Sequence, residues 1–213
     1  LLAETRTRDD LDIKLVMSHL ACADEPDHPL NLKQRDAFNA VRAKLPGVPA
    51  SLANSSGVFL GNAYTHDLPR PGIAIYGGNP TPGKPNPMRA VATLEGTIMQ
   101  VRHVAKGEPV GYSATWIATR PSRIAVLGAG YKDGVPRARS SSTHEGGPQV
   151  YLAGQRCPII GRISMDMMAI DVTDVPEAQS SRGAHAELLG PNLPIDEVAS
   201  WAGTISYELL TRL

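Results

Sequence analysis

The sequence predicts an α/β segment followed by a mostly antiparallel β domain. The first 70 or so residues give strand, helix and strand signals in turn, whereas the second half shows alternating and hairpin patterns. Between them, proline recurs too often in residues 79–87 for a helix or a central strand. We therefore place the boundary there, with residues 1–78 in the α/β segment and residues 79–213 in the β domain.

Two short strands are predicted in the α/β segment, and each ends in polar residues. Residues 11–19 form an apolar run that we interpret as a buried strand whose polar end includes His19. A second strand around residues 50–53 leads into Asn54-Ser55-Ser56-Gly57. Polar side chains at the carboxyl ends of parallel strands are typical of barrel enzymes, which keep their chemistry there.

A helix is predicted between these strands. Phe38, Val41 and Leu45 follow one another at helical spacing, Asn31 is a candidate N-cap, and Pro46-Gly47 ends the helix. Strand, helix and strand in this order indicate a parallel pairing.

Residues 70–78 combine an arginine, a proline-glycine break and a short apolar run. Gly72 can bring its backbone close to a ligand, and Gly72 and Ile73 offer consecutive amide donors that Pro71 lacks. One interpretation is a phosphate site beside Arg70. The other is an ordinary turn that enters a buried strand, and the stretch alone leaves both open.

The β domain is predicted from alternating and turn-bounded runs. The expected strands lie within residues 88–104, 123–127 and 163–172, and a hairpin is expected at Ala153-Gly154. The last segment, residues 195–213, reads as two short helices or as a helix and a strand around Gly203.

Charge and cysteine content restrict the function classes. The chain has 213 residues with 21 basic and 21 acidic side chains, so nothing favours a nucleic acid or an anionic membrane as partner, and a small-molecule ligand fits better. No apolar run reaches the roughly 20 residues that span a bilayer, so the expected location is the cytoplasm. Cys22 and Cys157 are expected to be free thiols.

Seven motifs, taken together and in order, resemble those of bacterial alanine racemases. They are Met17-Ser18-His19-Leu20-Ala21-Cys22-Ala23-Asp24, Ala53-Asn54-Ser55-Ser56-Gly57, Arg70 to Gly78, Val110-Gly111-Tyr112-Ser113-Ala114-Thr115-Trp116, Gly130-Tyr131-Lys132-Asp133-Gly134, Gly161 to Thr173 and Thr204-Ile205-Ser206-Tyr207-Glu208. The resemblance implies the last strands of a (β/α)8 TIM-type barrel, followed by the β domain. It also implies a homodimer with shared active sites that interconverts L- and D-alanine with pyridoxal 5'-phosphate, for peptidoglycan precursor supply.

The resemblance implies catalytic roles for Tyr112, His19 and Arg70. A racemase needs two bases that flank the α-carbon of its substrate, and Tyr112 matches one of them. His19 would lie between Arg70 and the Tyr112 of the other subunit. Arg70 would face the pyridine nitrogen of the cofactor, where an arginine cannot accept a proton. Read alone, Tyr112 fits a packed turn and His19 an ordinary loop residue.

The resemblance also implies residues that bind cofactor and substrate. Ser55, Gly72, Ile73 and Tyr207 match the phosphate cradle, although Ser55 alone could be a turn residue and Tyr207 a helix-face aromatic. In the partner's substrate pocket, Met165 would offer its amide to the substrate carboxylate, though methionine is more often core filler. Tyr131 and Asp133 match a motif at the way into the site, with Asp133 fixing a turn.

One part of the family pattern has no counterpart in the sequence. The family's lysine, which holds the cofactor as a Schiff base, belongs to a motif near the first barrel strand, and neither Lys14 nor Lys132 occupies an equivalent position. An arginine from a middle barrel strand is also expected to be missing. Since the chain also opens without methionine, we expect a C-terminal portion of such a racemase that is inactive alone.

Two alternatives stay open at this point. A racemase of the same fold could act on serine or lysine, because the sequence does not define the pocket size. A non-catalytic module for dimerisation or ligand binding would explain the missing lysine.

Overall fold

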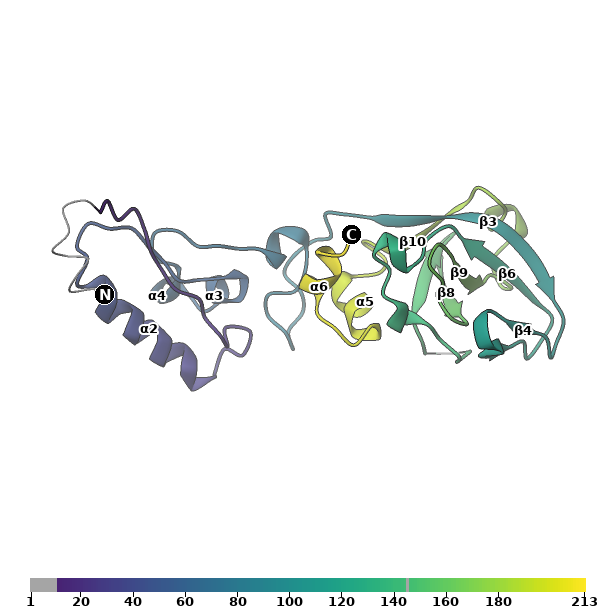
Figure 1. Ribbon diagram of the computed structural model, residues 1–213, viewed down its shortest axis with the longest axis horizontal. Coiled ribbons are helices and arrows are strands. Elements are labelled where there is room, and N and C mark those ends of the chain that lie inside the picture. The colour runs from purple at the N-terminus through teal and green to yellow at the C-terminus, as the bar shows by residue number, and fades with distance from the viewer. Residues whose placement is uncertain (1–10, 145) are drawn as a thin grey trace. The chain divides into compact units, whose positions relative to one another are not determined.

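The computed structural model describes residues 11–144 and 146–213, which form two compact units (Figure 1). Among these residues, the first unit comprises 11–75 and 79–88, and the second comprises 76–78 and 89–213. Each unit is described by itself below.

The first unit contains one parallel strand pair and the helix that links its strands. Strand β1 (Val16–Met17) pairs with β2 (Ala50–Ser51) in parallel, and helix α2 (Pro29–Arg42) connects them, as the sequence predicts. The remaining elements are α3 (Ser55–Phe59), α4 (Asn62–Thr65) and the 3-10 helix η1 (Ile73–Tyr76).

Helix α2 packs on the strand pair through one aromatic side chain. Phe38 is buried in one cluster with Leu20, Ala50, Leu52 and Tyr64. This small core holds the carboxyl ends of both strands in place, and the polar residues that follow them are therefore fixed as well.

Three local predictions in the first unit are wrong. The first strand has only two residues and is not buried, with Met17 59% exposed, because in the described part of the chain it has β2 on one side and no other strand. Helix α2 begins at Pro29 and not after Asn31. His28 is its N-cap and accepts the Leu30 N–H at Nδ1, while Asn31 is buried within the helix and donates to the Glu25 carbonyl.

The third wrong prediction concerns residues 73–76, which form η1 and not a strand. The Ile75 N–H donates to the Gly72 carbonyl at 3.0 Å, which closes a tight turn directly after Pro71. Only Ile73 of this run is buried. The apolar run therefore does not indicate a strand, because one buried side chain and one local hydrogen bond suffice for a 3-10 turn.

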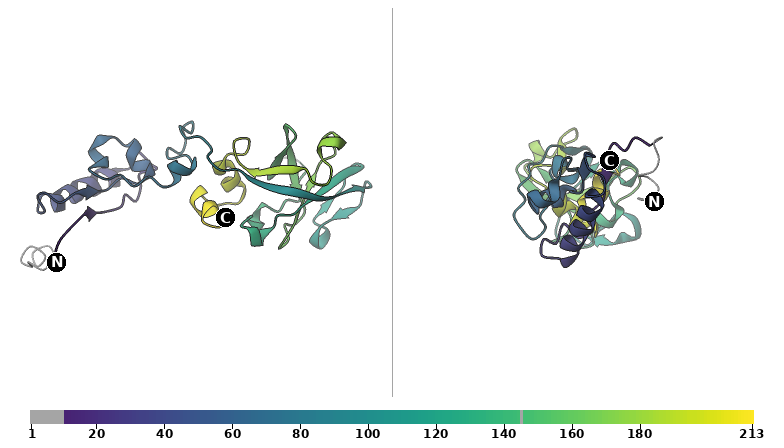
Figure 2. Two further views of the ribbon diagram at one scale, coloured as in Figure 1. Left: turned by 90° about the horizontal axis from the view of Figure 1, so that it is seen from above. Right: turned by 90° about the vertical axis from the view of Figure 1, so that its left-hand side faces the viewer.

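The second unit is a closed barrel of six antiparallel strands in the order β10-β3-β6-β9-β8-β7. In chain order these are β3 (Leu94–Val104), β6 (Ser122–Leu127), β7 (Gln149–Leu152), β8 (Gln155–Ile160), β9 (Met168–Asp171) and β10 (His185–Leu189). In the left view of Figure 2, β3 is the long teal strand with β10 alongside it. The predicted antiparallel domain is confirmed.

Shorter elements complete the second unit. They are β4 (Pro109–Val110) paired with β5 (Trp116–Ile117), the 3-10 helices η2 (Tyr112–Ala114), η3 (Tyr131–Asp133), η4 (Arg137–Arg139) and η5 (Glu177–Gln179), and the helices α5 (Ile195–Trp201) and α6 (Ser206–Leu210). The final segment is therefore two helices, which settles the alternative that the sequence left open.

The predicted hairpin connects β7 and β8. Ala153 and Gly154 both have positive φ, 51° and 89°, and Leu152 pairs with Gln155. A two-residue turn with positive φ at both positions matches the twist of the flanking strands. The strand predicted over residues 163–172 is shorter than expected, since β9 covers only Met168–Asp171 and a turn precedes it.

Apolar residues from all six strands fill the barrel, among them Ile98, Leu127, Ile159 and Ile170, each fully buried. Cys157 belongs to this core, and burial raises the pKa of its thiol to about 12. Cys22 and Cys157 are both free thiols, as predicted. No helix among the described residues is long and apolar enough to cross a membrane.

Gly130 packs too closely against a neighbouring segment to accept a side chain. A Cβ there would lie 2.3 Å from the Met165 carbonyl oxygen and 2.5 Å from that of Ser164, and backbone atoms cannot move aside as a flexible side chain can. We expect Gly130→Ala to lower the free energy of unfolding by about 3 kcal/mol, at the upper end of what overpacking costs. Urea unfolding measures this, with Gly96→Ala of β3 as control, because a Cβ there would lie 3.5 Å from its nearest neighbours, in ordinary van der Waals contact, and Gly96 is not at positive φ. A Gly130→Ala effect no larger than that of Gly96→Ala would contradict the close approach.

Candidate functional site

Arg70 is held at the carboxyl ends of the two parallel strands. Its Nη2 donates to the Ser18 carbonyl at 2.7 Å, and its Nη1 donates to Ser51 Oγ at 2.5 Å. The Arg70 backbone N–H donates to the Ala53 carbonyl at 2.8 Å. Among the described residues no carboxylate forms an ion pair with Arg70. The strand ends therefore fix a guanidinium whose positive charge is not neutralised by the described part of the chain.

His19 lies next to this guanidinium and has a hydrogen-bond donor near each ring nitrogen. Arg70 Nη2 is 3.4 Å from His19 Nδ1, and Asn54 Nδ2 is 3.3 Å from His19 Nε2. The Asn54 amide is oriented by its other end, since Asn54 Oδ1 accepts the Gly57 N–H and caps helix α3. The predicted neighbourhood of His19 and Arg70 is thus present in the structure.

Ser55 and the loop after Arg70 form a second polar group in the same unit. Ser55 Oγ accepts the Gly72 N–H at 2.8 Å and the Ala74 N–H at 3.3 Å. The Ile73 N–H, between these two amides, has no hydrogen-bond partner among the described residues. A Cβ added at Gly72 would meet nothing within 4 Å, so open space lies beside this backbone. The buried Ser55 hydroxyl therefore gathers two amides of this loop, and the Ile73 amide lies between them in the chain.

Sequence reasoning assigned no role to Ser51 and Asn54, which position the two central side chains. Ser51 is fully buried, accepts from Arg70 and donates from Oγ to the Leu68 carbonyl at 2.5 Å. Asn54 belongs to the motif Ala53-Asn54-Ser55-Ser56-Gly57. The only sequence signal for Ser51 is a polar residue inside a predicted strand, and its partner can be identified only from the position of Arg70 in space.

In the second unit, Tyr112 lies on a turn in which three of its near neighbours in sequence have positive φ. Gly111, Ser113 and Ala114 have φ of 80°, 60° and 50°, and the Tyr112 side chain is 69% exposed. An ideal Cβ at Gly111 lies 3.5 Å from the Arg162 nitrogen, so this turn packs against the segment that leads to Met165. Non-glycine residues at positive φ are uncommon and cluster at functional sites.

The Tyr131 and Met165 motifs are joined backbone to backbone. The Tyr131 N–H donates to the Ser164 carbonyl and the Lys132 N–H to the Met165 carbonyl, each at 3.0 Å. Met165 is 53% exposed and Tyr131 43%, which rules out the core-filler interpretation for Met165. Asp133 Oδ2 accepts the Gly130 N–H at 3.0 Å, so Asp133 fixes the turn, as the sequence predicts.

The two lysines that sequence reasoning excluded as cofactor ligands are both ion-paired. Lys132 pairs with Asp166, and this hydrogen bond raises the pKa of the Lys132 ammonium. Lys14 is highly exposed and pairs with Asp12. A lysine nucleophile must be deprotonated, and a partner that raises the pKa works against that.

Tyr207 lies on α6 and is 45% exposed, while Leu209 of the same helix is buried against α5. The phenol is therefore on the accessible side of the helix. This arrangement fits a ligand contact as well as the helix-face aromatic that the sequence left as an alternative.

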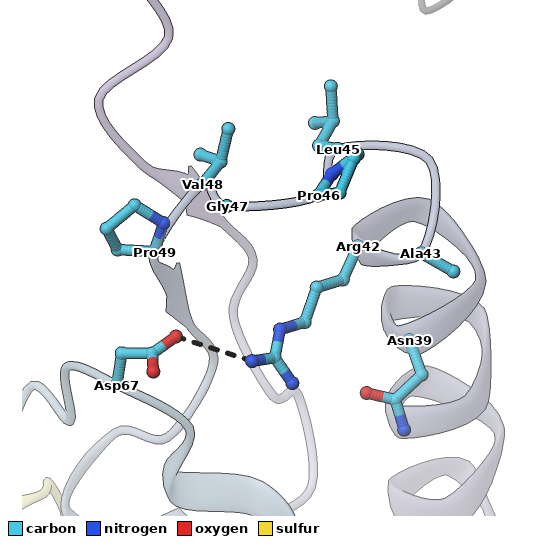
Figure 3. Close-up of a pocket in the computed structure, with 9 residues that line it drawn as sticks. All are labelled: Asn39, Arg42, Ala43, Leu45, Pro46, Gly47, Val48, Pro49 and Asp67. Carbon is cyan, nitrogen blue, oxygen red and sulfur yellow. Dashed lines mark ion pairs between the residues drawn. The ribbon is translucent and has the colours of Figure 1, made fainter.

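The first unit also has a broad pocket of about 730 Å³ whose lining includes none of the candidate-site residues (Figure 3). Val48 and Pro49, which precede β2, line it together with Arg42 and Asp67, whose ion pair spans 3.6 Å. It is therefore near the amino end of β2, whereas His19 and Ser55 follow the carboxyl ends. Barrel enzymes use the carboxyl ends, so size alone does not make this pocket the candidate site.

A βαβ unit with a polar site at its strand ends, together with a closed β-barrel domain, defines a two-domain protein of the barrel-plus-β class. Residues 91–213 match the family model of the alanine racemase C-terminal domain, and residues 1–80 match the family model of the alanine racemase N-terminal domain. The chain belongs to the alanine racemase family.

Relatives and solved structures agree with this assignment. The alanine racemase of Rhodospirillum rubrum is 52% identical over 213 residues, covering 100% of this chain and 56% of that protein, and a catabolic alanine racemase of Mesorhizobium japonicum is 47% identical, covering 100% and 54%. The crystal structure of alanine racemase from Bartonella henselae with covalently bound pyridoxal phosphate has a TM-score of 0.88 at 40% identity, covering 100% of this chain and 57% of that one. The chain thus spans little more than half the length of these relatives. The predicted fold class, barrel strands followed by a β domain, is confirmed.

Proposed function

We propose that this chain is part of a racemase that interconverts L- and D-alanine with pyridoxal 5'-phosphate. Residues 1–78 would be the last strands of its (β/α)8 barrel, and residues 79–213 would form its β domain. The observation that carries the proposal is the Arg70 guanidinium, anchored by Ser18 and Ser51 beside His19 with no described carboxylate paired to it. Support for the cofactor comes from the Bartonella henselae relative, which is described as holding covalently bound pyridoxal phosphate.

The residues present fit the phosphate of this cofactor. Ser55 supplies a hydroxyl, Ile73 supplies an amide, and the space beside Gly72 is open. The Gly72 amide, which donates to Ser55 Oγ in this structure, would exchange that bond for one to the phosphate. Neutral donors bind phosphate well when several converge. Tyr207 is the fourth proposed donor, through its phenol.

Arg70 would lie at the pyridine nitrogen. When bound, the cofactor supplies an electron sink for the bonds at the substrate α-carbon. An arginine has no acceptor, so it leaves the ring nitrogen unprotonated and keeps that sink weak. Arg70 would thereby favour return of a proton to the α-carbon over transamination, and His19 would link Arg70 to the base.

Tyr112 would move the proton. Its phenol oxygen would take the α-proton on one face of the substrate, opposite a second base that the resemblance assigns to the family's N-terminal lysine. We propose a homodimer, in which Tyr112, Tyr131 and Met165 of one subunit complete the site of the other. The Met165 backbone amide would hold the substrate carboxylate, and Tyr131 would line the way in. A cytoplasmic location and a supply of D-alanine to peptidoglycan are part of this proposal.

The test is the racemisation of L-alanine by the complete protein, followed by circular dichroism with and without added pyridoxal 5'-phosphate. We expect cofactor-dependent loss of the circular dichroism signal of L-alanine, and a slower reaction with L-serine and L-lysine. Faster turnover of serine or lysine would contradict the substrate assignment. Cofactor binding without turnover of any of the three amino acids would favour the non-catalytic module.

Ser51→Ala tests how Arg70 is positioned. The variant removes one of the acceptors of the guanidinium, and a hydrogen bond to a charged group contributes about 1.5–3 kcal/mol. We expect kcat for alanine to fall at least tenfold with KM little changed. The share of turnovers that end in transamination should rise, because Arg70 then holds the ring nitrogen less firmly.

Ser56→Ala is the matched control, since Ser56 is also buried in the first unit and is not among the described hydrogen-bond partners of the Arg70 guanidinium. It should leave both kcat and the transamination share near the parent values. Equal losses in the two variants would show that Ser51 contributes only to folding.

A further inference from the structure

Arg139 is a charged side chain in the interior of the second unit. It ends the 3-10 helix η4 and is 2% exposed. Its surroundings are mainly apolar side chains of the barrel and of helices α5 and α6, among them Leu188, Val198 and Leu209. Arginines are almost never fully buried unless they are paired, so this position requires an explanation.

The protein satisfies the Arg139 guanidinium only in part. Nη2 donates to the Gln149 carbonyl at 2.8 Å, and Nη1 makes a long contact of 3.4 Å to the Leu188 carbonyl. Nε has no hydrogen-bond partner among the described residues. The Trp201 ring lies 5.8 Å from the guanidinium carbon and contributes a cation–π contact.

No described carboxylate balances the charge. Glu187, the buried acid among the described residues of this unit, accepts from the backbone of Asn192 and Leu193 and from the Asn192 side chain. None of the ion pairs among the described residues includes Arg139. Burial alone lowers the pKa of the Arg139 guanidinium to about 10, with no acidic neighbour acting in the opposite direction. Among the described residues, the positive charge of Arg139 is therefore stabilised by two backbone carbonyls and the face of the Trp201 ring.

A small cavity of about 20 Å³ lies against Arg139. It is lined by Leu94, Gly134, Val135, Pro136, Arg139, Leu188, Leu189, Val198, Leu209 and Leu213. Arg139 is the one lining residue with a polar side chain. This volume holds a single water-sized particle.

We propose that this cavity binds a small monovalent anion of the halide class, chloride under physiological conditions, against the Arg139 guanidinium. A water molecule needs two to four polar partners and leaves the charge uncompensated, whereas the lining offers one polar side chain that carries a full positive charge. A monatomic anion needs no directional donors other than the guanidinium. Polyatomic anions such as sulfate exceed the cavity. The site lies within the barrel unit and is independent of the proposed racemase chemistry.

Crystals of the complete protein soaked in sodium bromide test the site directly. We expect an anomalous peak at the bromine edge within hydrogen-bond distance of the Arg139 guanidinium. A cavity that contains only a water molecule, with no anomalous signal, would overturn the proposal.

Thermal unfolding tests the site in solution. At constant ionic strength, replacing gluconate by chloride should raise the Tm of the parent protein progressively with chloride concentration, as mass action requires for a ligand of the folded state. The rise should vanish in Arg139→Met, which fills the site with an apolar chain of similar length. Arg139→Lys, which keeps a charge, should retain part of it.

Arg137→Met is the matched control, because Arg137 begins the same 3-10 helix but is exposed. It changes the net charge equally and should leave the chloride-dependent rise intact. If Arg139→Met shows the same rise as the parent, the salt effect is general and the proposal fails. An anomalous peak without any chloride effect on Tm would mean binding at crystal concentration only, which also counts against it.

Discussion

Replacing Arg70 by glutamate in the complete protein is expected to lower alanine racemisation by about a hundredfold and to increase the transamination side reaction. The loss is of the size seen when one preorganised electrostatic partner is removed from an active site. Glutamate reverses the chemistry at this position, because a carboxylate can keep the ring nitrogen protonated and so strengthen the electron sink. It also cannot donate to the Ser18 carbonyl or to Ser51.

The measurement separates D-alanine formed from pyruvate formed, starting from L-alanine. Arg70→Lys is the matched control: it keeps a positive charge and has no acceptor, but it loses the two-armed contact with Ser18 and Ser51. We expect Arg70→Lys to slow racemisation without raising pyruvate. If glutamate reduces both products by the same factor, the electronic role of Arg70 is wrong and its role is one of position.

Tyr112→Phe is expected to lower racemisation by about 10²- to 10⁴-fold, the range that a positioned acid or base contributes. The substitution removes only the phenol oxygen, and the side chain is 69% exposed on its turn, so the fold should be unaffected. With two bases on opposite faces, conversion requires both of them, whereas removal of the α-proton from one enantiomer requires one. Exchange of the α-proton with deuterated solvent should therefore continue for one enantiomer of alanine and stop for the other.

Tyr151→Phe provides the control, since it removes a phenol from β7 of the same unit at a partly buried position. It should leave racemisation and exchange at parent levels. Equal exchange of both enantiomers in Tyr112→Phe would exclude Tyr112 as one of two bases.

The sequence predicted the fold well where patterns are local. The hairpin at Ala153-Gly154 follows from turn chemistry and strand β6 from a short apolar run, and both are present. Predictions failed where a run of apolar residues has few partners. Residues 11–19 and 73–76 look like strands, yet the first gives a two-residue strand with one described neighbour and the second a 3-10 turn. Periodicity reports on burial, and these segments are largely exposed.

The residues of the candidate site were predicted from the motifs that resemble the family, and not from periodicity or local patterns. His19 and Arg70 are 51 positions apart in the chain, and only the parallel pairing of β1 and β2 brings the two side chains together. No periodic signal encodes that distance. The same is true of Ser51, whose contact with Arg70 depends on the loop that returns the chain from α4 to the strand ends.

The central claim is that the residues after these two strands hold pyridoxal 5'-phosphate in a defined orientation. The most direct measurement is a crystal structure of the complete protein with this cofactor. We expect the phosphate within hydrogen-bond distance of Ser55 Oγ and of the Gly72 and Ile73 amides, and the pyridine nitrogen facing the Arg70 guanidinium. A phosphate bound away from Ser55, or a carboxylate in place of Arg70 at the ring nitrogen, would contradict the proposed site.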